Sequence, residues 1–104
     1  MVEQNFVAVA RLEELPAGSK KLVVAGGIEI VLCNSNDTIY AVRNLCSHAY
    51  EKLDCGRMKN GWISCPVHGA RFDLETGEPI NPPAVMPIET YNVRVSGDVI
   101  EVAV

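Results

Sequence analysis

Apolar and polar residues alternate with a period of two in several short runs of this chain, which is the pattern of half-buried β-strands. Turn-forming residues separate the runs at intervals of about 8–12 residues, a spacing typical of all-β sandwiches and barrels. No segment has helical periodicity. The runs that we interpret as strands are residues 6–9, 21–25, 28–33, 38–43, 62–64, 71–73, 91–95 and 99–104. The pattern therefore predicts an all-β fold.

Two glycine turns indicate how neighbouring strands pair. Gly26-Gly27 separates two runs by two residues, the length of a tight primed hairpin turn, and Ser96-Gly97-Asp98 gives a second hairpin signal. The segment from about 44 to 83 is richer in Gly, Pro, Cys and His than the rest of the chain. We expect residues 1–104 to form a single domain, with 44–83 as a small subdomain of loops and short strands that carries the site.

Charge and hydropathy exclude several classes of function. Nine Lys+Arg against 13 Asp+Glu give a net charge of −4 without a basic cluster, which argues against nucleic acid as a partner. No apolar stretch approaches the roughly 18 residues that span a bilayer. The first ten residues do not resemble a signal peptide. We therefore expect a soluble cytoplasmic protein with no membrane contact, whose thiols stay mostly reduced.

The candidate chemistry lies in a motif of cysteines and histidines. It reads Cys46-Ser47-His48, then 16 residues, then Cys65-Pro66-Val67-His68, and it uses both histidines of the chain. Two thiolates and two imidazoles make a complete ligand set for a metal centre. The set fits a tetrahedral zinc ion, or a [2Fe–2S] cluster with one iron on the cysteines and the other on the histidines, and the residues can also be ordinary core side chains. The one-residue gap in Cys46-x-His48 is short for zinc, and no recognition helix follows.

Two cysteines lie outside this motif. A plant-type cluster needs Cys-x₄-Cys-x₂-Cys, whereas the spacings here are 12, eight and nine intervening residues. Cys33 ends an apolar run, and we interpret it as a buried small hydrophobe. We expect Cys55 to be a packed or partly exposed thiol, and Trp62 to lie in the core.

The motif and its flanks resemble the Rieske ferredoxins of bacterial aromatic-ring dioxygenase systems, and the likeness covers nearly the whole chain. The residues that carry it are 44–48, 65–73, 76–79, Pro82 and Pro83. The resemblance implies a Rieske-type β-sandwich or barrel with one [2Fe–2S] cluster. It implies Cys46 and Cys65 as ligands of the inner iron, and His48 and His68 as ligands of the outer iron near the tip.

The resemblance also indicates a subtype. High-potential Rieske proteins of respiratory complexes carry a disulfide where this chain has Glu51 and Val67. They carry a serine and a tyrosine, which bond to sulfur, where this chain has Ala70 and Phe72. Fewer donors to sulfur stabilise the reduced cluster less, so we expect a potential on the order of −150 mV, near the lower end of the Rieske range. Ala49 departs from the glycine that is common after the first histidine of the family.

The resemblance implies an electron carrier and not an enzyme. Its partners would be a flavin-dependent NAD(P)H reductase and a terminal oxygenase that hydroxylates an aromatic ring, and it would dock to each transiently as a monomer. His48 and His68 would be the electron exit. The chain has no nucleotide-binding glycine fingerprint, and no histidines are left for a catalytic iron site. Two alternatives stay open, namely a small subunit of a nitrite-reductase-like enzyme and a structural Cys₂His₂ zinc domain.

Overall fold

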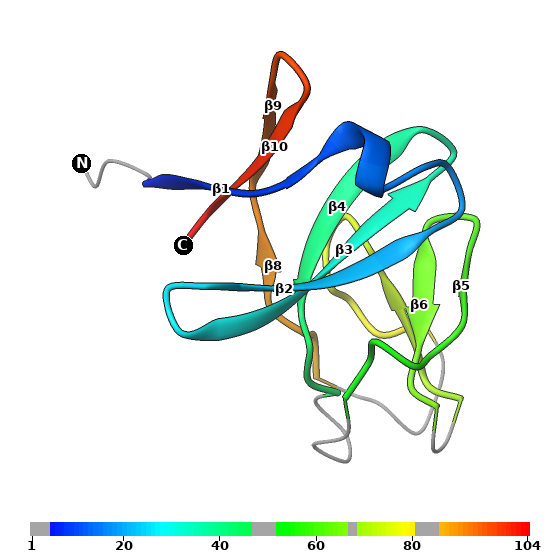
Figure 1. The fold of residues 1–104 in the computed structure, drawn as a ribbon. Coiled ribbons are helices and arrows are strands. Elements are labelled where there is room, and N and C mark those ends of the chain that lie inside the picture. The colour runs from blue at the N-terminus through cyan, green and yellow to red at the C-terminus, as the bar shows by residue number, and fades with distance from the viewer. Residues whose placement is uncertain (1–4, 47–51, 67–68, 81–85) are drawn as a thin grey trace.

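Three antiparallel sheets make up the part of the chain that the computed structural model describes, namely residues 5–46, 52–66, 69–80 and 86–104 (Figure 1). Sheet A has the strand order β1-β10-β9, sheet B has the order β2-β3-β4-β8, and sheet C has the order β5-β6-β7. The strands are β1 Phe6–Arg11, β2 Lys20–Ala25, β3 Ile28–Ser35, β4 Thr38–Arg43, β5 Met58–Lys59, β6 Trp62–Ser64, β7 Arg71–Asp73, β8 Thr90–Tyr91, β9 Val93–Ser96 and β10 Val99–Ala103. The predicted all-β fold is confirmed.

Helical structure in the described residues is limited to one 3₁₀ turn, η1, at Leu12–Glu14. It follows β1 and leads into the turn before β2. None of the described residues form a helix that is long and apolar enough to cross a membrane.

Sheet B is the middle layer, because its two faces contribute to two different cores. Successive side chains of a strand point to opposite faces, so β3 sends Ile30 and Leu32 to one side and Val31 and Cys33 to the other. The framework core lies between sheets A and B and consists of Ala10, Leu15, Val23, Ala25, Ile30, Leu32, Ala41, Ile100 and Val102. The cysteine core lies between sheets B and C and consists of Val31, Cys33, Val42, Cys46, Leu53, Ile63, Cys65, Ala70, Phe72, Leu74 and Ile88.

Tight hairpin turns with positive φ angles set the register of neighbouring strands. Gly26 and Gly27 both have positive φ (57° and 76°), as the sequence predicts for the β2–β3 turn. Asn60 and Gly61 have the same conformation (45° and 82°) and join β5 to β6. Strand β5 is not predicted by the sequence pattern, because a strand of two residues shows no alternation. Gly97, with a φ of 63°, lies in the predicted β9–β10 hairpin.

The strand expected at residues 91–95 is wrong as a single element. Thr90 and Tyr91 pair with β4 in sheet B, whereas β9 begins at Val93 and pairs with β10 in sheet A. The chain passes from one sheet to the other at Asn92, whose carbonyl accepts a hydrogen bond from the Ala103 N–H (2.9 Å). Alternation continues across the crossing, so the pattern alone hides it.

Trp62 lies outside the cysteine core, contrary to expectation. Its neighbour Ile63 is fully buried there, so Trp62 faces the outer side of sheet C and is only half-buried. The guanidinium carbon of Arg71 lies 4.5 Å from the centroid of the indole ring. The tryptophan is therefore held by a cation–π contact at the surface.

Candidate metal centre

The two cysteines of the predicted ligand set lie in one buried cluster. Cys46 is 0% exposed and Cys65 is 1% exposed, and neither forms a disulfide with another described cysteine. Cys46 follows the end of β4, and Cys65 comes directly after β6. The structure thus brings together two residues that are 19 positions apart in the chain.

The other two predicted ligands, His48 and His68, lie outside the described residues, as do Ala49, Glu51 and Val67. The described residues contain no group of three or more possible metal ligands. The structure therefore describes two of the four predicted ligands, Cys46 and Cys65.

The segment that follows Cys65 closes on itself. The Cys65 N–H donates to the Ala70 carbonyl (2.7 Å), and the Gly69 N–H donates to the Cys65 carbonyl (2.9 Å). Gly69 has a φ of 70°, a conformation that glycine adopts without steric cost. Because Ser64 pairs with Arg71, this loop spans the ends of β6 and β7 and directs Cys65 into the core.

The segment before Cys46 is held in place by Asn44, a residue with no role predicted from its type or position. Asn44 is 4% exposed. Its Oδ1 accepts hydrogen bonds from the N–H groups of Leu53 (2.7 Å) and Asp54 (2.8 Å), while its Nδ2 donates to Glu29 Oε1 (3.1 Å). Its own N–H donates to the Glu29 carbonyl (2.9 Å). A buried asparagine with these partners fixes the backbone two residues before a predicted ligand.

Cys33 shares the cysteine core with Cys46 and Cys65, but it is not part of the predicted ligand set. It is 0% exposed, and burial raises the pKa of its thiol to about 12, although the Lys20 charge acts in the opposite direction. The thiol is therefore protonated at neutral pH and behaves as a small hydrophobe, as predicted. Cys55 is exposed, which is consistent with the expected partly exposed thiol.

Ala70 and Phe72 lie in the same buried cluster as the cysteines, and neither side chain has a hydroxyl. Both are 0% exposed and belong to the cysteine core. Every member of this core is an apolar residue or a cysteine. An apolar site that buries the thiols of both predicted cysteine ligands is a suitable half of a soft metal centre, since thiolates are the ligands that iron–sulfur clusters use. The described residues thus fit the cysteine side of a [2Fe–2S] cluster.

Comparison with known proteins gives the same assignment. Residues 5–92 match the family described as the Rieske [2Fe-2S] domain. The chain is 36% identical over 92 residues to the ferredoxin component of the naphthalene 1,2-dioxygenase/salicylate 5-hydroxylase systems of Ralstonia sp., which covers 88% of each chain. It is 37% identical over 97 residues to the naphthalene 1,2-dioxygenase ferredoxin component of Pseudomonas aeruginosa, which covers 93% of this chain and 92% of the relative.

Solved structures agree with these relatives. The ferredoxin of carbazole 1,9a-dioxygenase from Nocardioides aromaticivorans IC177 superposes with a TM-score of 0.89 at 40% identity, over 94% of this chain and 96% of that one. A chain in the complex of reduced oxygenase and oxidized ferredoxin of carbazole 1,9a-dioxygenase also matches with a TM-score of 0.89, at 26% identity, over 97% of this chain and 94% of that one.

These matches span nearly the full length of the relatives, and the family is defined by one [2Fe–2S] cluster. The chain therefore belongs to the Rieske [2Fe–2S] family, as one of the small ferredoxins that act as electron carriers of multicomponent aromatic-ring dioxygenase systems.

Proposed function

We propose that this ferredoxin carries single electrons from a flavin-dependent NAD(P)H reductase to the terminal oxygenase of an aromatic-ring dioxygenase system. The observation that carries the proposal is the pair of buried cysteines, Cys46 and Cys65, in a chain that matches such ferredoxins over most of its length. The match to a chain from a ferredoxin–oxygenase complex supports an oxygenase as one partner. These relatives favour a carrier over a nitrite-reductase subunit.

The ligand set that we propose joins the described and undescribed parts of the motif. Cys46 and Cys65 hold one iron, and His48 and His68 hold the other. When bound, the cluster supplies a one-electron redox centre. Neutral imidazoles leave this centre less negative than four thiolates would, which raises its potential relative to an all-cysteine cluster. Each imidazole also has a second ring N–H that can donate to a docked partner, so we assign the electron exit to the histidine side.

We propose a potential on the order of −150 mV, near the lower end of the Rieske range. Ala70 and Phe72 are buried beside the cysteines and offer no hydroxyl to sulfur. Glu51 and Val67 replace the disulfide cysteines of the high-potential type. We expect Ala70→Ser and Phe72→Tyr to raise the midpoint potential, measured by voltammetry, by part of the roughly 450 mV that separates the two ends of the range. A midpoint above zero for the unmodified protein would contradict the proposed subtype.

The carrier is proposed to be a cytoplasmic monomer that docks transiently through a small interface. We propose a single Rieske domain over residues 1–104, with a cluster-binding subdomain at about 44–83. Leu53, Ile63 and Phe72 of that segment share the cysteine core with Val31 and Val42 of sheet B, which supports one continuous unit.

Cysteine variants test the cluster directly. In the purified protein we expect a brown colour, iron and sulfide in equal amounts, and a rhombic paramagnetic resonance signal on reduction. Cys46→Ser and Cys65→Ser should each abolish the signal, because serine does not replace a thiolate here. Cys55→Ser and Cys33→Ala are the matched controls, and both should keep it. A colourless protein with one bound zinc ion would overturn the proposal in favour of the zinc domain.

Turnover tests the carrier role. A flavin-dependent reductase and an aromatic-ring oxygenase, sought first among the genes that neighbour this one, are purified and mixed with this ferredoxin, NADH and the aromatic substrate of that oxygenase. We expect product formation to require this ferredoxin and to be lost with Cys65→Ser. Equal product in its absence would contradict the assigned role.

A further inference from the structure

A five-residue turn at 53–57, which we call the bridging turn, lies between the two cysteine-bearing segments. It is closed by a hydrogen bond from the Gly56 N–H to the Leu53 carbonyl (2.8 Å). Leu53 is fully buried in the cysteine core, and Gly56 is buried as well. None of the five residues belongs to the ligand set, so the turn needs another explanation for its tight fixation.

On one side the bridging turn is bound to the segment that carries Cys46. Two consecutive N–H groups, those of Leu53 and Asp54, donate to the single Oδ1 atom of Asn44 (2.7 and 2.8 Å). Asn44 precedes Cys46 by two residues. Asn44 is 4% exposed, and its bond to the Leu53 N–H is buried while its bond to the Asp54 N–H is partly buried, so breaking the first would leave buried polar groups unpaired.

On the other side the bridging turn is bound to Ser64, the residue before Cys65. The Arg57 N–H donates to Ser64 Oγ (3.2 Å), and the Ser64 N–H donates to the Arg57 carbonyl (2.8 Å). Gly56 lies so close that a Cβ there would be 1.8 Å from the Ser64 carbonyl oxygen. Gly56 is not among the described glycines with positive φ, so close packing, rather than backbone conformation, requires glycine at this position.

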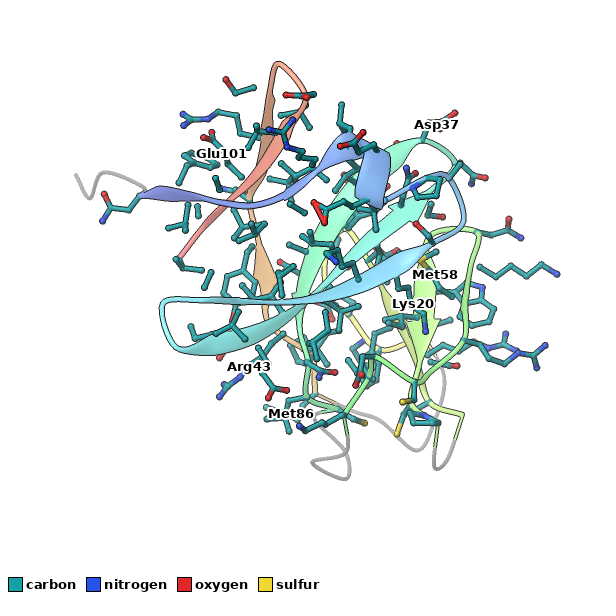
Figure 2. The ribbon with its side chains drawn as sticks, in the orientation of Figure 1. Lys20, Asp37, Arg43, Met58, Met86 and Glu101 are labelled. Atoms are coloured by element: carbon teal, nitrogen blue, oxygen red, sulfur yellow. The ribbon has the colours of Figure 1, made fainter. Side chains whose placement is uncertain are left out.

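Lys20 fastens the bridging turn to sheet B. Its Nζ donates to the Asp54 carbonyl (3.0 Å) and to the Gly56 carbonyl. Lys20 lies in β2 opposite Cys33, and Figure 2 shows its side chain directed from β2 toward the β5–β6 side of the molecule. An ammonium group on two carbonyls makes charge-assisted bonds, which are stronger than neutral ones.

We propose that the bridging turn sets the spacing between Cys46 and Cys65, and that Lys20, Asn44 and Gly56 are positioning residues for the metal centre. The inference rests on the proposed function, because it assumes that these cysteines hold the cluster. Groups that orient metal ligands without touching the metal typically change affinity by roughly 10- to 100-fold when they are removed. Here the bridging turn would orient each cysteine through hydrogen bonds to a residue shortly before it in the chain, Asn44 for Cys46 and Ser64 for Cys65.

Gly56→Ala is the sharpest test, with Gly61→Ala as its control in the same subdomain. The new Cβ at 56 must displace the Ser64 backbone and with it Cys65. We expect altered g values and visible circular dichroism, together with roughly 10-fold faster cluster loss to a chelator. At Gly61 a Cβ meets nothing within 4 Å, although the φ of 82° is strained for alanine. Gly61→Ala should therefore lower the melting temperature without changing the spectra.

Lys20→Met is tested against Lys21→Met. The two lysines are adjacent in β2, but within the described part of the chain the Lys21 side chain pairs with Glu14 alone, at the surface (3.5 Å). We expect Lys20→Met to speed amide hydrogen exchange at Leu53 and Gly56 and to speed cluster loss several-fold. Lys21→Met should leave both rates within twofold of the unmodified protein.

Asn44 offers a rescue experiment. Asn44→Asp keeps an oxygen acceptor for the two N–H groups but places a carboxylate against Glu29. Glu29→Gln restores a donor–acceptor pair at that contact. We expect the single Asn44→Asp variant to lose its cluster faster, and the double variant Glu29→Gln/Asn44→Asp to recover most of the stability of the cluster.

The outcomes separate the two proposals. If the unmodified protein shows a Rieske signal and the Gly56, Lys20 and Asn44 variants all keep its spectra and chelation rate, the positioning role is wrong while the proposed function stands. If the unmodified protein shows no such signal, the proposed function fails. The hydrogen-exchange comparison of Lys20→Met with Lys21→Met then still decides whether Lys20 holds the bridging turn.

Discussion

The framework core and the cysteine core share sheet B, yet they are closed on their other sides by very different structures. Sheet A covers the framework core with strands of four to six residues. Sheet C covers the cysteine core with strands of only two or three residues. Turns and side-chain-to-backbone hydrogen bonds therefore supply much of the order around the cysteines. From this comparison we expect the site half to depend on its turns and on the proposed cluster, whereas the framework half depends on strand pairing.

Large-to-small substitutions in the two cores should have the largest effects. Phe72 and Ile100 are both 0% exposed, one in each core. Phe72→Ala and Ile100→Ala should each lower the free energy of unfolding, by about 3–5 and 2–5 kcal/mol respectively. If the halves differ as described, Phe72→Ala loses visible absorption at lower urea than far-ultraviolet ellipticity, while the two transitions coincide for Ile100→Ala. Coincident transitions in both variants would show that the halves unfold as one unit.

Removal of the cluster should have the next largest effect, and it should be confined to one half. With a chelator under reducing conditions, we expect amide exchange at Ser64 and Cys65 to accelerate roughly 100-fold, equivalent to about 2.7 kcal/mol. The Ala103 amide, which donates to the Asn92 carbonyl in the other half, should change little. Equal acceleration at Ala103 would contradict the independence of the framework.

Alkaline pH should weaken the cysteine core through Cys33. Burial holds the folded-state pKa of this thiol at about 12, against an ordinary value of 9.0. Above pH 9 the unfolded chain ionises while the folded chain stays protonated. The stability contributed by this thiol is therefore complete below pH 9 and is lost as the pH rises toward 12, with a slope of about 1.4 kcal/mol per pH unit.

Cys33→Val should remove this part of the slope in urea titrations between pH 9 and 10.5. The pKa of Tyr91 is also raised to about 12 by burial and by Glu89. Its contribution to the pH dependence of stability is the same in both proteins, so the difference between their slopes reports Cys33. If the free energy of unfolding depended on pH identically in the two proteins, the Cys33 thiol would ionise in the folded state at its ordinary pKa, which would contradict the prediction.

Surface contacts in sheet A should have the smallest effect. Arg94 Nε lies 2.7 Å from Glu101 Oε1, and its guanidinium carbon lies 4.2 Å from the centroid of the Phe6 ring. Arg94→Ala should lower the free energy of unfolding by at most about 1 kcal/mol and leave the cluster signal unchanged. Glu101→Gln removes the ion pair alone, so thermal melts of the two variants separate the ring contact from the charge pair. A changed resonance signal in either variant would contradict the separation of the two halves.

The sequence predicts the bounds of a strand correctly where local residue patterns mark both of its ends. The strands at 38–43, 62–64 and 71–73 have the predicted bounds, because alternation and turn residues define both of their ends. The pairing of Cys46 with Cys65 in one core was predictable from the motif and its resemblance. The crossing at Asn92 was not, because a strand that changes sheets keeps its alternation.

The supporting residues of the site were also beyond sequence reasoning. Lys20 looks like an ordinary exposed lysine of a strand, and Asn44 looks like a turn residue. Their partners are backbone groups 34 and 9 residues away, respectively. Gly56 has no unusual conformation to mark it, and only the position of the Ser64 carbonyl shows why it lacks a side chain. Contacts to backbone leave no trace in residue type, so no pattern of side chains reports them.

Strand β3 serves both cores at once, and this has a consequence for how the protein tolerates change. Ile30 and Leu32 face the framework core, and Val31 and Cys33 face the cysteine core. Insertion of a single residue within β3 would exchange the two faces, so that each core would receive the side chains shaped for the other. The turns at Gly26–Gly27 and Asn36–Asp37, at the two ends of β3, have only two residues each, so they cannot accommodate an added residue without a change of strand register. Length variants in this protein should therefore be engineered away from β3, in which even one added residue would disturb both halves.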